Sequence, residues 1–205
     1  MAYSDNVAET VEQMKRSNPE IVTSIRIPLD EFATDRAVRV SGDCGEVLHF
    51  QADHKGRGFG TRSKDFIIKL IKEIHFTLLE NRIRDQVTIL VSGGIALAEH
   101  VAKIIACGAD GVGIDTALLA ALGCRLCHDC NERNCCPVEI DKVDVEWGAQ
   151  RIINLVGSWH SQLIEVLGAM GIREVRRLRG ELGRTMFFDC LLYTSPSPRD
   201  LSTSR

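Results

Sequence analysis

The chain lacks several features that would assign it to common functional classes. Its 205 residues contain no apolar run of membrane-spanning length, and the first 16 residues lack the apolar core of a signal peptide. The formal net charge is only −3, so no broad positive surface is expected for nucleic acid or for an anionic membrane. We therefore expect a cytoplasmic protein that binds neither nucleic acid nor a membrane.

Cysteine, in contrast, is abundant. The chain has eight cysteines and no secretion signal, which favours reduced thiols or metal ligands over disulfides. Five of them fall within 13 residues and precede Pro137: Cys124, Cys127, Cys130, Cys135 and Cys136. The ferredoxin run C-x2-C-x2-C-x3-C-P has similar spacing, so the cluster predicts an iron–sulfur site. A zinc site is the alternative, although zinc-binding cysteines usually form two pairs a dozen or more residues apart.

Strand and helix patterns alternate along most of the chain. Apolar, β-branched segments predict strands at 21–27, 37–40, 47–50, 87–91 and 111–114. Helical periodicity predicts helices at 4–16, 65–80, 97–107, 116–122, 145–170 and 173–182. The arginines from Arg173 to Arg184 are expected on a solvated helix face. Residues 191–205 are polar and aperiodic, and we interpret them as a non-native or disordered tail.

This alternation predicts an α/β fold with a parallel sheet covered on both faces. About four strand–helix units are visible, whereas a closed barrel needs roughly 250 residues. Residues 1–123 are therefore predicted to be the C-terminal half of a (β/α)8 TIM barrel. Residues 124–140 would form the iron–sulfur cluster loop, and 141–190 the C-terminal helices. An open doubly wound sheet is the alternative, but its G-x-G-x-x-G phosphate fingerprint is missing.

The ends of the last two predicted strands carry glycines. One strand leads into Ser92-Gly93-Gly94 and the next into Gly113, Asp115 and Thr116. In barrels, the loops after the last two strands often hold a phosphate, and paired glycines let the backbone approach it closely. The alternative is that Gly93-Gly94 only makes a tight turn.

The segment VTILVSGGIALAEHVAKIIACGADGVGIDTALLAALGC, with the cysteine cluster and CPVEI after it, resembles the FMN-binding synthase domain of glutamate synthase. The resemblance extends over roughly residues 18–182. It implies a (β/α)8 barrel that holds FMN and an iron–sulfur cluster. It also implies formation of glutamate from 2-oxoglutarate and glutamine-derived ammonia, through 2-iminoglutarate that FMN reduces.

The resemblance also suggests functional positions. The residues expected at the FMN phosphate are Ser92, Gly93, Gly94, Gly113 and Thr116. The expected cluster ligands are Cys124, Cys127, Cys130 and Cys136, with Cys135 as an alternative to Cys136, and both a 3Fe-4S and a 4Fe-4S cluster are possible. A ferredoxin or an NAD(P)H reductase subunit would supply electrons, and a glutaminase domain or subunit would supply ammonia.

Three departures from the family pattern lie at the expected active-site end. Arg26 replaces a lysine, the loop at 52–58 gains Lys55 and Arg57 in place of a glycine-rich run, and Asp115 replaces a glycine. We expect Arg26, Lys55 and Arg57 to bind an anionic substrate, and no catalytic residue is assigned. Two alternatives stay open: a non-catalytic flavin and iron–sulfur electron-transfer subunit, and another phosphate-binding TIM-barrel enzyme. The 205 residues alone are expected to be inactive.

Overall fold

The computed structural model of the chain describes residues 6–43, 46–127, 136 and 138–180. Four strands form one parallel sheet in the order β1-β2-β3-β4. Their bounds are Ser24–Pro28 for β1, Val47–Gln51 for β2, Thr88–Ser92 for β3 and Gly111–Gly113 for β4. The strand order follows the chain without a reversal, as in a segment of a barrel, whereas a doubly wound sheet reverses its order at a switch point. The predicted α/β class with a parallel sheet is confirmed.

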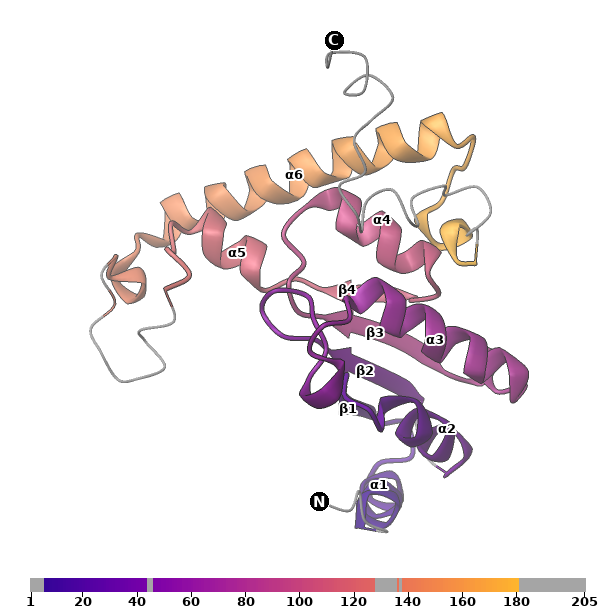
Figure 1. Ribbon diagram of the computed structural model, residues 1–205. Helices are drawn as coiled ribbons and strands as arrows, with labels where there is room; N and C mark the ends of the chain where they lie inside the picture. Colours follow the sequence, from indigo (N-terminus) through magenta and orange to yellow (C-terminus); the bar gives the residue numbers. More distant parts are fainter. Residues whose placement is uncertain (1–5, 44–45, 128–135, 137, 181–205) are drawn as a thin grey trace.

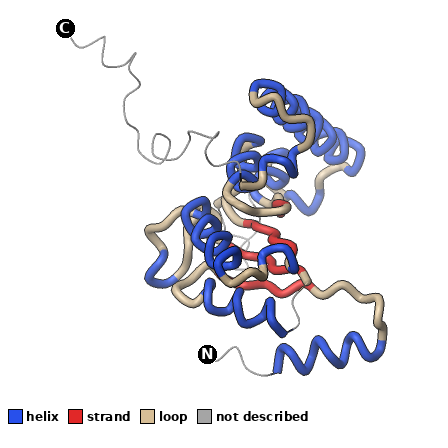
Figure 2. Tube along the Cα trace, turned by 90° about the vertical axis from the view of Figure 1, so that its right-hand side faces the viewer, coloured by secondary structure: helices blue, strands red, loops and turns tan. Residues whose placement is uncertain are grey.

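Helices connect each strand to the next. The connecting helices are α2 (Ala33–Asp43), α3 (Ile67–Glu80) and α4 (Ala98–Ala106). Figure 1 shows α1 (Asn6–Ser17) before the sheet and, beyond it, α5 (Thr116–Ala121) and the long helix α6 (Val145–Ala169). Short 3-10 turns occupy Gly60–Arg62, Arg84–Gln86, Ile140–Lys142 and Val175–Leu178. In Figure 2, α2 and α3 lie on one side of the strands.

Burial alternates along β1, β2 and β3 and shows which face the helices cover. One face carries buried residues throughout: Ile25, Ile27, Leu48, Phe50, Ile89 and Val91. Residues between them, such as Arg26, His49 and Leu90, are exposed or half-buried. Covering of both faces was expected, but within the described part of the chain the helices cover one face. This pattern fits a barrel segment, because its second face points into the barrel and meets only other strands.

The register arranges the uncovered face, called here the inner face, in layers. Ser24, Val47 and Thr88 form the first layer, and Arg26, His49, Leu90 and Gly111 form the second. Pro28, Gln51, Ser92 and Gly113 form the third layer, at the carboxyl ends of the strands. Layers of inward side chains are the packing unit of a barrel interior.

Two secondary-structure predictions are wrong. Residues 37–40 lie in α2 and not in a strand, because Ala33, Ala37 and Val40 are buried at helical spacing. Residues 173–182 do not form the predicted helix within the described range, where the structure has only the 3-10 turn Val175–Leu178. The other predicted strands and helices are present, with ends shifted by a few residues.

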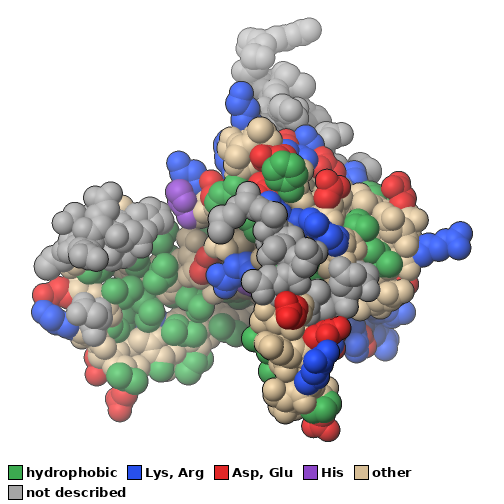
Figure 3. Space-filling model, turned by 90° about the horizontal axis from the view of Figure 1, so that it is seen from below, with side chains coloured by type: hydrophobic (Ala, Val, Ile, Leu, Met, Phe, Trp, Pro, Cys, Tyr) green, Lys and Arg blue, Asp and Glu red, His purple; other side chains and the backbone are tan. Residues whose placement is uncertain are grey.

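The last helix packs across the outside of the molecule. Asp144 accepts a hydrogen bond from the Trp147 backbone N–H at 2.8 Å and caps the start of α6. Trp159 and Leu167 are buried on the side of α6 that packs against the rest of the molecule. Figure 3 shows hydrophobic side chains gathered on the side where α5 and the start of α6 lie. Among the helices described, none is long and apolar enough to cross a membrane.

Candidate functional site

The carboxyl ends of the strands bring several predicted site residues together. Ser92 pairs in register with Gly113 on the neighbouring strand, and Gly93 and Gly94 follow Ser92 directly. The loop after β2 reaches the same end, because the Ala52 N–H donates to the Ser92 carbonyl at 2.8 Å. The polar and glycine-rich ends of β2, β3 and β4 therefore form one edge of the sheet, called here the carboxyl edge.

Gly93 and Gly94 are required by close backbone packing. Their φ angles are +105° and +67°, in a region that L side chains rarely adopt. A Cβ on Gly93 would lie 2.7 Å from the Ala52 carbonyl carbon, and one on Gly94 would lie 2.5 Å from the Gly56 Cα. The backbone of residues 52–56 leaves no space for a side chain at Gly93 or Gly94, which supports the interpretation of these glycines as a tight turn. Because neither glycine carries a side chain, the backbone after β3 can also be approached closely by an anion.

The end of β4 is less open as an anion site. The Asp115 carboxylate accepts a hydrogen bond from the Thr116 backbone N–H at 2.6 Å and caps α5. One donor that a phosphate could use is therefore engaged by a carboxylate of the chain itself. Gly113 keeps the adjacent space free, since a Cβ there would lie 3.1 Å from Ser92 Cβ.

The predicted substrate cations lie in two places. Arg26 is exposed in the second layer of the inner face, and Lys55 and Arg57 lie in the loop after β2. Asp53 orders that loop by accepting hydrogen bonds from the backbone N–H groups of Lys55, at 2.9 Å, and Arg57, at 2.7 Å. The Arg57 guanidinium lies 4.8 Å from the centroid of the Phe66 ring, in a cation–π contact that holds it over that ring.

His49 is a polar residue of the site that sequence reasoning missed. Its Nε2 lies 2.8 Å from Ser92 Oγ, on the inner face next to the carboxyl edge. Burial, and then the positive charge of Arg26, lowers the pKa of His49, which keeps the imidazole neutral at neutral pH. The available signal was a histidine between Leu48 and Phe50, at the alternate position of an otherwise apolar strand.

The cysteine cluster lies only partly within the described structure. Cys124 and Cys136 are half-buried and Cys127 is exposed, while Cys130 and Cys135 fall outside the described residues. Cys124 Sγ accepts a hydrogen bond from the Leu126 N–H at 3.4 Å. Among residues that the structure places, no three His, Cys, Asp or Glu side chains are close enough to hold a metal. The donor set fits a cluster chemically, since thiolates are the usual ligands of iron–sulfur centres.

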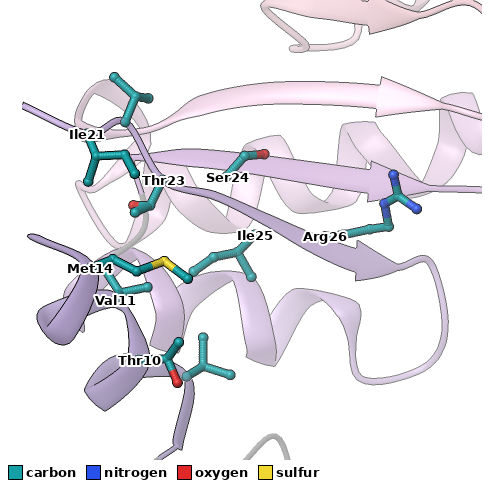
Figure 4. A pocket seen from close by; sticks show the side chains of 10 residues that line it. Thr10, Val11, Met14, Ile21, Thr23, Ser24, Ile25 and Arg26 are labelled. Atoms are coloured by element: carbon teal, nitrogen blue, oxygen red, sulfur yellow. The ribbon is translucent and has the colours of Figure 1, made fainter. Parts of the chain in front are cut away.

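A separate cavity of about 610 Å³ lies between α1 and β1. Figure 4 shows apolar side chains from both elements around it, including Val11, Met14 and Ile25. Arg26 borders the cavity but extends away from α1 in this view. The apolar lining and its place beside the edge strand separate this cavity from the polar carboxyl edge.

The family model and the relatives that match this chain all name the same protein family. A family model described as a conserved region in glutamate synthase matches residues 5–173. An archaeal-type glutamate synthase (NADPH) of Thermotoga neapolitana is 36% identical over 185 residues, which cover 87% of this chain and 34% of that protein. The archaeal glutamate synthase (NADPH) of Methanocaldococcus jannaschii is 40% identical over 114 residues, 52% of this chain and 22% of that protein. The chain thus spans about a third or less of these relatives.

Solved structures with a similar fold include those of a flavocytochrome and an oxidase. The recombinant flavin-binding domain of baker's yeast flavocytochrome b2 superposes with a TM-score of 0.59 at 17% identity. The match covers 96% of this chain and 44% of that one. A mandelate oxidase superposes with a TM-score of 0.53 at 18% identity, over 84% of this chain and 41% of the other. At these identities the likeness shows the fold alone.

Proposed function

Because the chain belongs to the glutamate synthase family, we propose that it forms the C-terminal half of an FMN-binding (β/α)8 barrel in a glutamate synthase-like oxidoreductase. The reaction would reduce 2-iminoglutarate, formed from 2-oxoglutarate and ammonia, to glutamate. The observation that carries this proposal is the carboxyl edge, where Ser92, Gly93 and Gly113 lie together on neighbouring strands. Barrel enzymes build their active sites at this edge.

The chain's own residues would divide the binding task. Backbone N–H groups of Gly93 and Gly94, with Ser92, Gly113 and Thr116 beside them, would hold the FMN phosphate. When bound, FMN supplies hydride transfer to an electrophilic carbon such as that of an imine.

Arg26, Lys55 and Arg57 would bind the substrate carboxylates through charge-assisted hydrogen bonds. The Arg57 contact with Phe66 supports this role, because it limits the motion of the guanidinium while its N–H edges can still donate. The exposure of Lys55 is consistent with a contact that forms only when substrate arrives.

The cysteine loop would supply the entry for electrons. Cys124, Cys127, Cys130 and Cys136 would hold a 3Fe-4S or 4Fe-4S cluster, whose chemistry is electron transfer. A ferredoxin or an NAD(P)H reductase subunit would be the electron donor, and a glutaminase domain or subunit would provide ammonia. The polypeptide that completes the barrel would cover the inner face and pair with the edge strand β1, so the 205 residues alone are expected to be inactive.

The test uses the complete reading frame that contains this chain, purified without air. We expect a flavin spectrum, bound iron and acid-labile sulfide, and formation of glutamate from 2-oxoglutarate and glutamine or ammonia with a suitable reductant. Flavin and cluster without glutamate formation would instead indicate an electron-transfer subunit. A colourless, zinc-loaded protein would overturn the iron–sulfur assignment.

Two cysteine variants make the cluster test specific. Cys124→Ser should lower the iron content and the glutamate formation together. Cys107→Ser is the matched control, because Cys107 is 1% exposed and burial raises the pKa of its thiol to about 12. A thiol that stays protonated is a poor metal ligand, so this variant should keep its iron. Equal iron loss in both variants would contradict the proposed ligand set.

A further inference from the structure

The inner face carries a polar pair, His49 and Ser92, of which the proposed function uses only Ser92. His49 lies in the second layer on β2, and Ser92 lies in the third layer at the end of β3. Their side chains meet across the two strands, with His49 Nε2 2.8 Å from Ser92 Oγ. Arg26 shares the layer of His49, directly across the β1–β2 pair. Arg26 therefore places a positive charge beside the pair, and Ser92 places the pair at the glycine-rich carboxyl edge.

The hydrogen bond controls what Ser92 can offer a ligand. A serine hydroxyl has one hydrogen to donate, and a neutral imidazole has one N–H. If His49 Nε2 carries the hydrogen, it donates to Ser92 Oγ and the hydroxyl hydrogen is free to point at a ligand. If Nε2 accepts, Ser92 spends its hydrogen on His49 and presents only lone pairs, which repel an anion. The first arrangement favours an oxyanion and the second disfavours it.

The surroundings leave room for such a ligand. Gly113 lies beside the pair in the third layer, and a Cβ at this position would be 3.1 Å from Ser92 Cβ and 3.9 Å from His49 Nε2. A side chain here would crowd the hydroxyl, so the glycine keeps access to Ser92 open. Arg26 adds a positive charge to the same face, which attracts anions and disfavours a second proton on His49.

We propose that His49 is a positioning residue that turns the Ser92 hydroxyl into a hydrogen-bond donor for an oxyanion at the carboxyl edge. The inference rests on the proposed function, in which that oxyanion is either the FMN phosphate or a carboxylate of 2-oxoglutarate. Both ligands have the same requirement, a donor aimed from Ser92. His49 acts through Ser92 and does not touch the reacting atoms.

The test measures dissociation constants with the complete reading frame, for FMN, riboflavin and 2-oxoglutarate. His49→Leu should weaken binding of FMN or of 2-oxoglutarate about threefold, because the Ser92 hydroxyl keeps its hydrogen but loses the contact that aims it. This is less than the roughly tenfold loss expected when the donor itself is removed. His49→Gln keeps an N–H donor and should restore most of the affinity that His49→Leu loses. Riboflavin lacks the phosphate, so a loss confined to FMN identifies the phosphate as the oxyanion. A loss confined to 2-oxoglutarate identifies the substrate carboxylate.

One double variant and one control variant distinguish a positioning role of His49 from a purely structural one. Ser92→Ala should weaken the same ligand as His49→Leu, and combining both should add little further loss because they act through one contact. His160→Gln, on the exposed side of α6, is the histidine control and should bind all three ligands normally. Additive losses, equal losses for riboflavin and FMN, or unchanged affinities in His49→Leu would each overturn the inference.

Failure of the proposed function can be distinguished from failure of the His49 positioning role. A wild-type protein that binds no FMN would overturn the flavin proposal, whereas the His49–Ser92 pair can still be tested with inorganic phosphate and 2-oxoglutarate. Weaker binding of either anion by His49→Leu would then support the positioning role. Equal affinities of wild type and His49→Leu for both anions would overturn it.

Discussion

The amino ends and the carboxyl ends of the strands differ in what their polar side chains bind. At the amino edge, where the strands begin, Arg84 is 2% exposed and its hydrogen bonds all go to the protein. It donates to His75 Nδ1 at 3.1 Å, to the Val87 carbonyl at 2.9 Å, to the Gly108 carbonyl at 2.6 Å and to Asp110 at 2.8 Å. At the carboxyl edge, Ser92 and His49 are half-buried and face an uncovered side of the sheet. The hydrogen bonds of Arg84 are made within the protein, whereas the His49–Ser92 pair has room for a ligand beside it.

The amino edge shows how a buried charge is stabilised. Burial, and then the charge of Arg84, lowers the pKa of His75, so its neutral Nδ1 can accept the guanidinium hydrogen. Asp110 balances the charge and also accepts from the Ile89 N–H at 2.8 Å. Arg179, from the segment after α6, makes a second ion pair with Asp110 at 2.5 Å. This network connects α3, β3 and the start of β4 to the end of the 3-10 turn Val175–Leu178, so we assign it to stability.

The largest effect is expected from Arg84→Met. The change leaves Asp110 and two carbonyls without their buried donor, which should lower the free energy of unfolding by about 3–5 kcal/mol. Urea denaturation measures it. Arg16→Met is the control, since the Arg16–Glu12 pair has side-chain exposures of 78% and 68% and should contribute less than about 0.5 kcal/mol. Similar losses in both variants would contradict the structural role of the amino edge.

The next effect concerns the loop contact at the carboxyl edge. Gly94→Ala combines a left-handed φ of +67° with a Cβ 2.5 Å from the Gly56 Cα, so it should cost about 2–3 kcal/mol and displace the loop. Gly171→Ala isolates the cost of the left-handed backbone, because Gly171 has φ +66° and, among the described residues beyond its chain neighbours, no atom lies within 4 Å of an added Cβ. We expect about 1 kcal/mol there, measured by the same denaturation. Equal costs would show that the loop does not constrain Gly94.

A third prediction uses the acid dependence of stability. Burial raises the pKa of Asp110, but hydrogen bonds from the Ile89 N–H and Arg84 outweigh it and lower the pKa below the ordinary value of 3.8. A lowered folded-state pKa stabilises the protein above the unfolded value, and this stabilisation is lost as pH falls through the folded value. Asp110→Asn should therefore flatten the decline of the unfolding free energy below about pH 4. An unchanged acid slope would contradict the assignment of that decline to Asp110.

The sequence allowed the α/β class and the parallel sheet to be predicted, because apolar strands alternate with amphipathic helices. It misplaced 37–40, where a short β-branched run hides the helical spacing of Ala33, Ala37 and Val40. It identified Ser92 and the glycines after it by their position at a strand end. It missed His49 and Arg84, since their partners lie 43 and 26 residues away in Ser92 and Asp110. It also assigned the arginines after Arg173 to a solvated face, whereas Arg179 pairs with Asp110.

The smallest change in stability, and the sharpest contrast with Arg84→Met, is expected from Ser92→Ala. The hydroxyl is half-buried and bonds one neutral side chain, so its loss should cost less than about 1 kcal/mol of unfolding free energy. Oxyanion affinity should nevertheless fall about tenfold, while Arg84→Met should leave affinity unchanged in the fraction that stays folded. Denaturation and ligand titration of both variants provide this crossed comparison. If Ser92→Ala lost stability rather than affinity, the carboxyl edge would have to be regarded as structural in the same sense as the amino edge.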